Sequence, residues 1–186
     1  MEMERIQAAI SATLDAPPGT GVEAPLSELA EALGGADIFR SLSPASLEGV
    51  ARLSSRVNIA PGSYLAQHGE TGEALYALWR GEVEITAPFE MGDITVRICG
   101  PSQCVPIACL LGEGRLVTSA RAISEVEAVR IPRDELLKLC ADDPVLGASL
   151  FRAVAELAMS RYRNTMTRLT DTIAQALAGT EAWAAV

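Results

Sequence analysis

The four cysteines and the single histidine are the residues of this sequence whose chemistry could extend to metals or redox reactions. Cys99, Cys104 and Cys109 follow one another at intervals of five residues, while Cys140 and His68 stand apart. Zinc and iron–sulfur sites usually draw on closely spaced cysteine pairs, and no CxxC occurs here. We interpret the cysteines as small, buried, reduced residues without metal, and keep a redox or metal role as the alternative.

The sequence has no motif that is typical of a catalytic site. Covalent catalysis needs a nucleophile beside a base, and no motif in the sequence predicts such a pair. A metal-dependent cupin barrel would need several histidines, whereas His68 is alone. We therefore expect a protein that is not an enzyme, with no catalytic residue, no metal and no cofactor.

The composition indicates a globular chain with an acidic surface. The 186 residues are 49% hydrophobic, which is enough for a full core, and the net charge is −9. An acidic chain repels a phosphate backbone, so we expect no direct contact with nucleic acid. No stretch is long and apolar enough for a membrane helix, and the start of the chain lacks the apolar run of a signal peptide. We expect a cytoplasmic protein.

Helical patterns occupy the first third of the chain. The spacing of apolar residues predicts helices over about 2–14, 26–33 and 44–53. Proline and glycine make residues 15–21 a linker. Ser43 precedes the third helix as an N-cap, with proline at the first helical position.

A series of short strands begins near Arg56. Residues 75–79 form a nearly continuous apolar run, as expected for a buried strand, and Gly69 and Gly81 stand where the chain must reverse. Residues 91–93 predict a turn between two alternating strands. Closely spaced strands with glycine turns favour a sandwich or barrel. The glutamates that alternate with apolar residues are expected to face water: Glu82, Glu84, Glu125 and Glu127.

The helical period returns near Asp134. A short amphipathic helix ends near Pro144, and a long helix follows over about residues 145–178, with Gly179 as its predicted end.

The order of these elements, together with three segments, resembles the cyclic-nucleotide-binding domain family, which includes the sensor half of bacterial catabolite-activator-type regulators. The segments are PGSYLAQHGE at 61–70, ALYALWRGEVEI at 74–85 and RAISEVEAVRIPRDEL at 121–136. The resemblance spans roughly residues 36–170. It implies a mainly β fold with flanking helices (α+β), namely a β-barrel of jelly-roll type followed by a long C-terminal helix.

Three parts of the chain follow from the resemblance and the element pattern. Residues 1–35 are expected to form a helical extension and residues 36–144 the barrel domain. Residues 145–186 are expected to form the long dimerisation helix and tail.

The ligand-binding cassette of the family is where this sequence departs from its relatives. The family uses a glutamate for the ribose hydroxyl, and an arginine with helix N-terminal amides for the phosphate. Aligned on Gly100-Pro101 and Leu110-Leu111, this chain has Pro106 at the glycine and Ile107 at the glutamate. Counting back from Arg121-Ala122 puts Leu116 at the arginine. The expected pocket is apolar, and its candidate residues are Cys104, Val105, Pro106, Ile107, Ala108, Cys109, Arg115, Leu116, Val117, Thr118 and Arg121.

Two functions remain open from the sequence. One is a non-enzymatic regulatory or interaction module that has lost cyclic AMP and cyclic GMP binding and presents a surface to another signalling protein. The alternative is a sensor of a cyclic nucleotide or other small ligand in a modified pocket, with Arg115 or Arg121 on the phosphate. Only seven residues follow Gly179, which leaves no space for a helix-turn-helix, so direct DNA reading is not expected.

The long helix predicts a homodimer. Its apolar residues would be exposed beyond a small barrel unless a second copy covers them. The predicted stripe consists of Leu150, Val154, Leu157, Met166, Leu169, Ile173 and Leu177, of which the first three could instead pack on the chain's own barrel. The N-terminal helix, with Ile6 and Ile10, is the alternative cover for this stripe.

Overall fold

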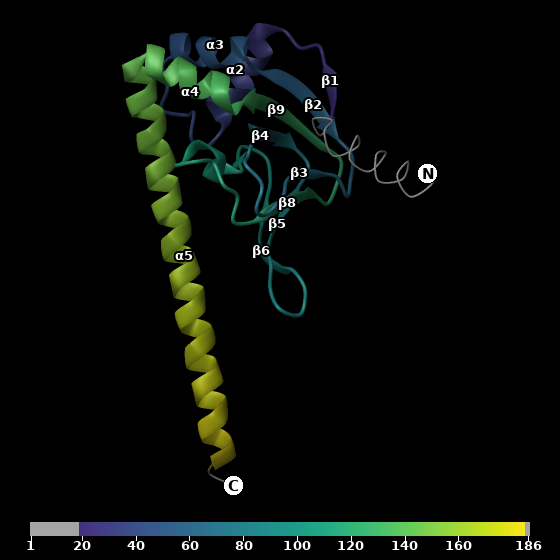
Figure 1. The fold of residues 1–186 in the computed structure, drawn as a ribbon, viewed down its shortest axis with the longest axis vertical. Helices are drawn as coiled ribbons and strands as arrows, with labels where there is room; N and C mark the ends of the chain where they lie inside the picture. The colour runs from purple at the N-terminus through teal and green to yellow at the C-terminus, as the bar shows by residue number, and fades with distance from the viewer. Residues whose placement is uncertain (1–18, 185–186) are drawn as a thin grey trace, which may run out of the picture.

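Two antiparallel sheets and a long C-terminal helix dominate the architecture (Figure 1). The computed structural model describes residues 19–184, with side chains described to residue 177. The strands are β1 (Thr20–Val22), β2 (Ser55–Ile59), β3 (Tyr64–Ala66), β4 (Ala74–Arg80), β5 (Val83–Ala87), β6 (Ile94–Cys99), β7 (Cys104–Val105), β8 (Ser119–Ala122) and β9 (Val126–Pro132). The helices are α2 (Leu26–Gly35), α3 (Pro44–Arg52), the short 3₁₀ helix η1 (Ile107–Leu110), α4 (Arg133–Asp142) and α5 (Pro144–Ala184).

The sheets place the predicted buried strand between two neighbouring strands, β9 and β7. One sheet has the strand order β1-β2-β9-β4-β7 and the other β3-β8-β5-β6. The β4 residues Ala74 to Leu78 are all buried, as the apolar run predicted. The predicted turn at residues 91–93 joins β5 to β6, with Gly92 at a φ of +119°. The mainly β class with flanking helices is confirmed.

The N-terminal helices form for local reasons and pack directly on the barrel. Ser43 caps α3 through its side chain, which accepts a hydrogen bond from the Ser46 amide at 3.1 Å, and Pro44 takes the first helical position. Leu29 and Leu33 of α2 are buried in the core. The helix expected over residues 2–14 lies outside the described residues.

The linker prediction for residues 15–21 was wrong at its end. Residues 20–22 form β1, which pairs antiparallel with β2 and extends the sheet by an edge strand. Glycine-rich sequence carries little strand signal of its own, so the pairing depends on an available edge of β2.

The long helix is confirmed, but its predicted end was wrong. Figure 1 shows α5 running along one side of the barrel and well beyond the β5–β6 hairpin. It continues through Gly179 to Ala184. A glycine within a helix costs only about 1 kcal/mol relative to alanine, and the alanines around it favour helix. None of the helices in the described part of the chain has the length and hydrophobicity that a membrane span would need.

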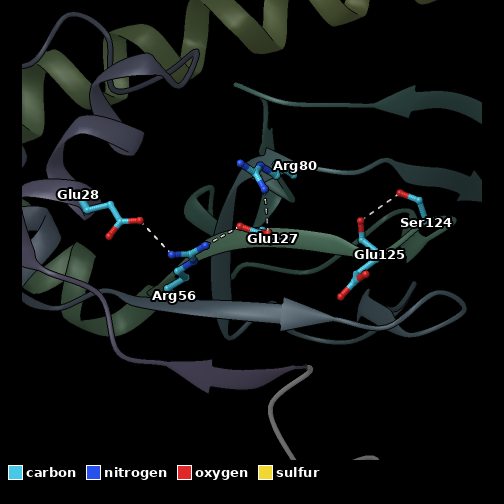
Figure 2. Close-up of polar contacts among 6 residues, drawn as sticks. All are labelled: Glu28, Arg56, Arg80, Ser124, Glu125 and Glu127. Atoms are coloured by element: carbon cyan, nitrogen blue, oxygen red, sulfur yellow. Dashed lines mark hydrogen bonds and ion pairs between the residues drawn. The ribbon is translucent and has the colours of Figure 1, made fainter.

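Ion pairs hold the outer surface of the larger sheet, and they correct the expectation that its glutamates only face water (Figure 2). Arg56 of β2 bonds Glu28 of α2 at 2.9 Å and Glu127 of β9 at 2.7 Å, and it lies over the Trp79 ring. Arg80 of β4 is 3.6 Å from Glu127, whose side chain is only 21% exposed. The cluster joins α2 to three strands.

Candidate functional site

A cavity of about 500 Å³ lies between the smaller sheet, the segment around η1, and α5. From the cassette segment and the loop after it, the lining residues are Val105, Pro106, Ile107, Ala108, Leu111, Val117 and Thr118. From the sheet they are Ile85, Val96, Arg97 and Ala120, and from α5 they are Ala158, Arg161, Tyr162, Asn164, Thr165 and Arg168. Six of the eleven residues predicted from the sequence thus come together at one cavity wall.

The two predicted cysteines and Leu116 do not line this cavity. Cys104 and Cys109 are completely buried, and burial raises the pKa of both thiols, that of Cys109 to about 12. The side chains of Cys109 and Leu116 lie beside Gly72, so close that a methyl group there would stand 2.6 Å and 3.1 Å from them. These residues form the barrel wall behind the cassette.

The two arginines proposed for a phosphate also lie away from the cavity. Arg121 bonds Glu84 at 3.0 Å on the outer side of the barrel, and this glutamate also accepts a hydrogen bond from Thr95. The Thr95 hydrogen bond, and then Arg121, hold the pKa of Glu84 below its usual range. Arg115 is exposed, and its backbone forms an isolated bridge with Thr71.

The cassette forms a single tight turn in this structure. The Val105–Pro106 peptide is cis, and η1 follows as four residues of 3₁₀ helix. The Cys109 amide donates to the carbonyl of Pro106 at 3.2 Å, and the Leu111 amide donates to that of Ala108 at 3.1 Å. Pro106 has no N–H, so the turn offers a ligand fewer amide donors than the family's cassette implies.

The expectation of an apolar pocket was incomplete, because three arginines enter the cavity from outside the cassette. Arg97 comes from β6, while Arg161 and Arg168 come from α5. The two helical arginines are seven residues apart, with Thr165 between them, and therefore share one face. That polar face was visible in the sequence next to the apolar stripe, but only the packing of α5 brings it against the cassette.

Arg161 is partly buried, with a side chain 20% exposed; Arg97 is also partly buried, and Arg168 is exposed. It donates to the carbonyl of Cys104 at 3.2 Å and lies 3.8 Å from the carboxylate of Asp37. Its Nε is buried without a hydrogen-bond partner in the structure. Burial, and then the nearby charge of Arg97, lower the pKa of Arg161, so this guanidinium is poorly compensated.

The other two cavity arginines have even fewer partners. Arg168 donates to the carbonyl of Val96 at 3.3 Å. Within residues 19–177, no ion pair joins Arg97 or Arg168 to a carboxylate. The side of the cavity next to α5 is therefore cationic, and no acidic residue of the described chain is among its lining.

The fold and the cavity define a class of domain in which a partly open cavity lies between an antiparallel β-barrel and a long C-terminal helix. Residues 56–143 match the family described as "Cyclic nucleotide-binding domain". The chain is 31% identical over 144 residues to the CRP-like cAMP-activated global transcriptional regulator of Mycobacterium tuberculosis. That match covers 77% of this chain and 62% of the relative, so the chain spans less than two thirds of the relative's length.

Solved structures agree on the fold. A cyclic nucleotide-binding domain from Methylobacillus flagellatus superposes with a TM-score of 0.67 and 20% identity, covering 79% of this chain and 83% of that one. The Thermus thermophilus catabolite activator protein gives a TM-score of 0.62 and 24% identity, covering 75% and 63%. The family that residues 56–143 match is the one that the sequence motifs predicted, and the solved structures share its fold.

Proposed function

We propose that this protein is a non-enzymatic regulatory module that keeps the cyclic-nucleotide-binding fold but does not bind cyclic AMP or cyclic GMP. The observation that carries the proposal is the chemistry of the cassette wall. Ile107 and Leu116 take the positions that the resemblance gives to the ribose-binding glutamate and the phosphate-binding arginine. Ile107 lines the cavity, and Leu116 is buried behind it.

The energetic consequence follows from the hydrogen bonds that a nucleotide would lose. A ribose hydroxyl that faces Ile107 in place of the family's glutamate loses its charged acceptor at the cassette, and such a lost hydrogen bond costs about 1–3 kcal/mol. No carboxylate lines the cavity in the described residues, and the amides of Cys109 and Leu111 are already bonded within the η1 turn. The Mycobacterium relative is named as activated by cAMP, and these cassette differences are the reason that we do not extend that property to this chain.

Calorimetry of the full chain against cyclic AMP, cyclic GMP and cyclic di-GMP tests the proposal. We expect no heat of binding at nucleotide concentrations up to about 100 µM, where a Kd of 1 µM, equivalent to about −8 kcal/mol, would be obvious. A micromolar Kd for cyclic AMP or cyclic GMP would contradict the proposal. In that case Arg115→Ala and Arg168→Gln would show whether the loop arginine or the cavity arginine holds the phosphate.

The module is proposed to act as a homodimer through the outer half of α5, presenting its surface to a further signalling protein. Leu150 and Val154 are completely buried within their own chain, so the first turns of the predicted stripe serve the monomer core. Met166, Leu169 and Ile173 are 39%, 49% and 50% exposed, with spacings of three and four residues. Such spacing suits a two-helix seam. Leu157 packs beside the core, and Leu177 continues the exposed stripe.

Light scattering of a charged variant tests the dimer. The double variant Leu169→Glu/Ile173→Glu should be monomeric, because burying four carboxylates at one seam is strongly unfavourable. Thr167→Glu/Gln175→Glu is the matched control, since 3.6 residues per turn places these two exposed positions on the opposite side of α5. A monomeric wild type would refute dimerisation, and a dimeric Leu169→Glu/Ile173→Glu protein would place the interface elsewhere.

A further inference from the structure

The three cavity arginines have no role in the regulatory function proposed above, and their charge is not balanced within the described chain. Asp37 is the one carboxylate paired with them, at 3.8 Å from Arg161. Its Oδ1 already accepts hydrogen bonds from the amides of Ile38 at 2.9 Å and Cys104 at 3.1 Å. A single, shared carboxylate cannot neutralise three guanidinium groups. Arg97 and Arg161 are partly buried and Arg168 is exposed, so the uncompensated charge is costly chiefly at the first two.

The cavity wall on the barrel side, opposite the arginines of α5, is apolar. Ile85, Val105, Ile107 and Ala120 line it from β5, β7, η1 and β8, and all four are buried. An occupant therefore meets apolar side chains toward the barrel and guanidinium groups toward α5 and β6. The volume of about 500 Å³ lies in the range of small-molecule pockets and would hold a ligand of two or three rings.

We propose that this cavity binds a small organic anion with an apolar body and no sugar, such as an aromatic carboxylate, sulfonate or phosphate ester, held by Arg97, Arg161 and Arg168. The inference rests on the proposed function, since it assigns a ligand class to a pocket that has lost the nucleotide cassette. Guanidinium groups bind planar anions through paired, charge-assisted hydrogen bonds, and they retain their charge when buried.

Because the three arginines come from two elements, a bound anion would contact both α5 and β6. Arg161 and Arg168 belong to α5, whereas Arg97 belongs to the edge strand β6 of the smaller sheet. An anion held by all three removes the repulsion between Arg97 and Arg161 and ties the helix to the barrel. Binding is therefore expected to stabilise α5 against the sheet at the start of the proposed dimer seam, since Arg168 lies between Met166 and Leu169.

Fluorescent probes test the proposal on the full chain. Anilinonaphthalene sulfonate is an anion with an aromatic body, and N-phenylnaphthylamine is its uncharged analogue. We expect the sulfonate to bind the wild type with one site per chain. Arg97→Gln and Arg168→Gln should each weaken the sulfonate about tenfold and leave the neutral probe unchanged, because a charge-assisted contact is lost. Arg163→Gln, an exposed arginine of the same helix, is the matched control and should change neither.

A second variant fixes the location of the probe. Ala158 lines the cavity from α5, and Ala158→Phe should fill it and abolish binding of both probes. Absence of sulfonate binding to the wild type, equal weakening by Arg163→Gln, or full binding to Ala158→Phe would each overturn the proposal.

Competition with cyclic AMP separates this inference from the function on which it rests. Failure of cyclic AMP to displace the sulfonate agrees with both proposals. Displacement by cyclic AMP, with loss of both ligands in Arg168→Gln, would overturn the loss of nucleotide binding while supporting the arginine site. If Arg97→Gln and Arg168→Gln bind the sulfonate with the affinity of the wild type, and cyclic AMP does not bind, the arginine site alone would be overturned.

Discussion

The reversal between β4 and β5 depends on Gly81, and replacing it with alanine should destabilise the barrel severely. Gly81 has a φ of +81°, and a Cβ atom there would lie 2.1 Å from the carbonyl oxygen of Glu125. The neighbouring contacts are backbone as well, with the Val126 Cα at 2.9 Å, so no side chain can rotate away. The strands must shift to admit the methyl group.

Gly62→Ala is the matched control for the loss of folding stability expected of Gly81→Ala. Gly62 has a similar φ of +87° but no atom within 4 Å of the added methyl group. A positive φ costs alanine about 1–2 kcal/mol, and the reduced entropy of the unfolded chain returns about 0.4–1 kcal/mol. Gly62→Ala should therefore destabilise the fold by about 1 kcal/mol. Gly81→Ala adds overpacking against rigid backbone, about 1–3 kcal/mol, for a total near 3 kcal/mol.

Urea denaturation followed by circular dichroism, at one protein concentration, measures the difference. With a denaturant slope of about 2 kcal/mol/M, the midpoint of Gly81→Ala should lie about 1 M below that of Gly62→Ala. Equal midpoints for the two variants would show that the clash relaxes without cost and would refute the reasoning.

Three further predictions concern the rest of the fold. Because burial raises the pKa of Cys109 from 9.0 to about 12 and raises that of Cys104 as well, iodoacetamide at pH 8 should label neither thiol until urea unfolds the chain. The stability contributed by the protonated Cys109 is fully present below pH 9 and is lost as the pH rises toward about 12; a flat urea midpoint across this range would contradict it. Glu127→Gln should cost about 1–2 kcal/mol, because it leaves Arg56 with one carboxylate in a partly exposed cluster, whereas the exposed Glu125→Gln should cost almost nothing. Elemental analysis should find no stoichiometric zinc or iron, and a metal at one per chain would favour the redox alternative for the cysteines.

Features set by a few neighbouring residues could be predicted from the sequence. Gly81 was predicted to stand at a reversal, and Ser43-Pro44 to begin a helix, because positive φ and helix capping depend on the residues themselves. The apolar run of β4 predicted its burial, since a continuous hydrophobic strand needs cover on both faces. The family motifs then predicted the fold, and the substituted cassette predicted which cavity wall lacks polar groups.

Only the tertiary structure decided what the rest of the cavity contains. Arg97 and Arg161 are far apart in the chain and carry no shared motif, yet the packing of α5 brings both to the cassette. The pairing of β8 with β5 placed Arg121 on the outer side of the barrel beside Glu84. A side chain's neighbours along the chain set its backbone conformation, whereas its charge partners depend on which element packs across from it. The sequence therefore determined the scaffold and the missing cassette, and the docking of one long helix determined the cationic wall.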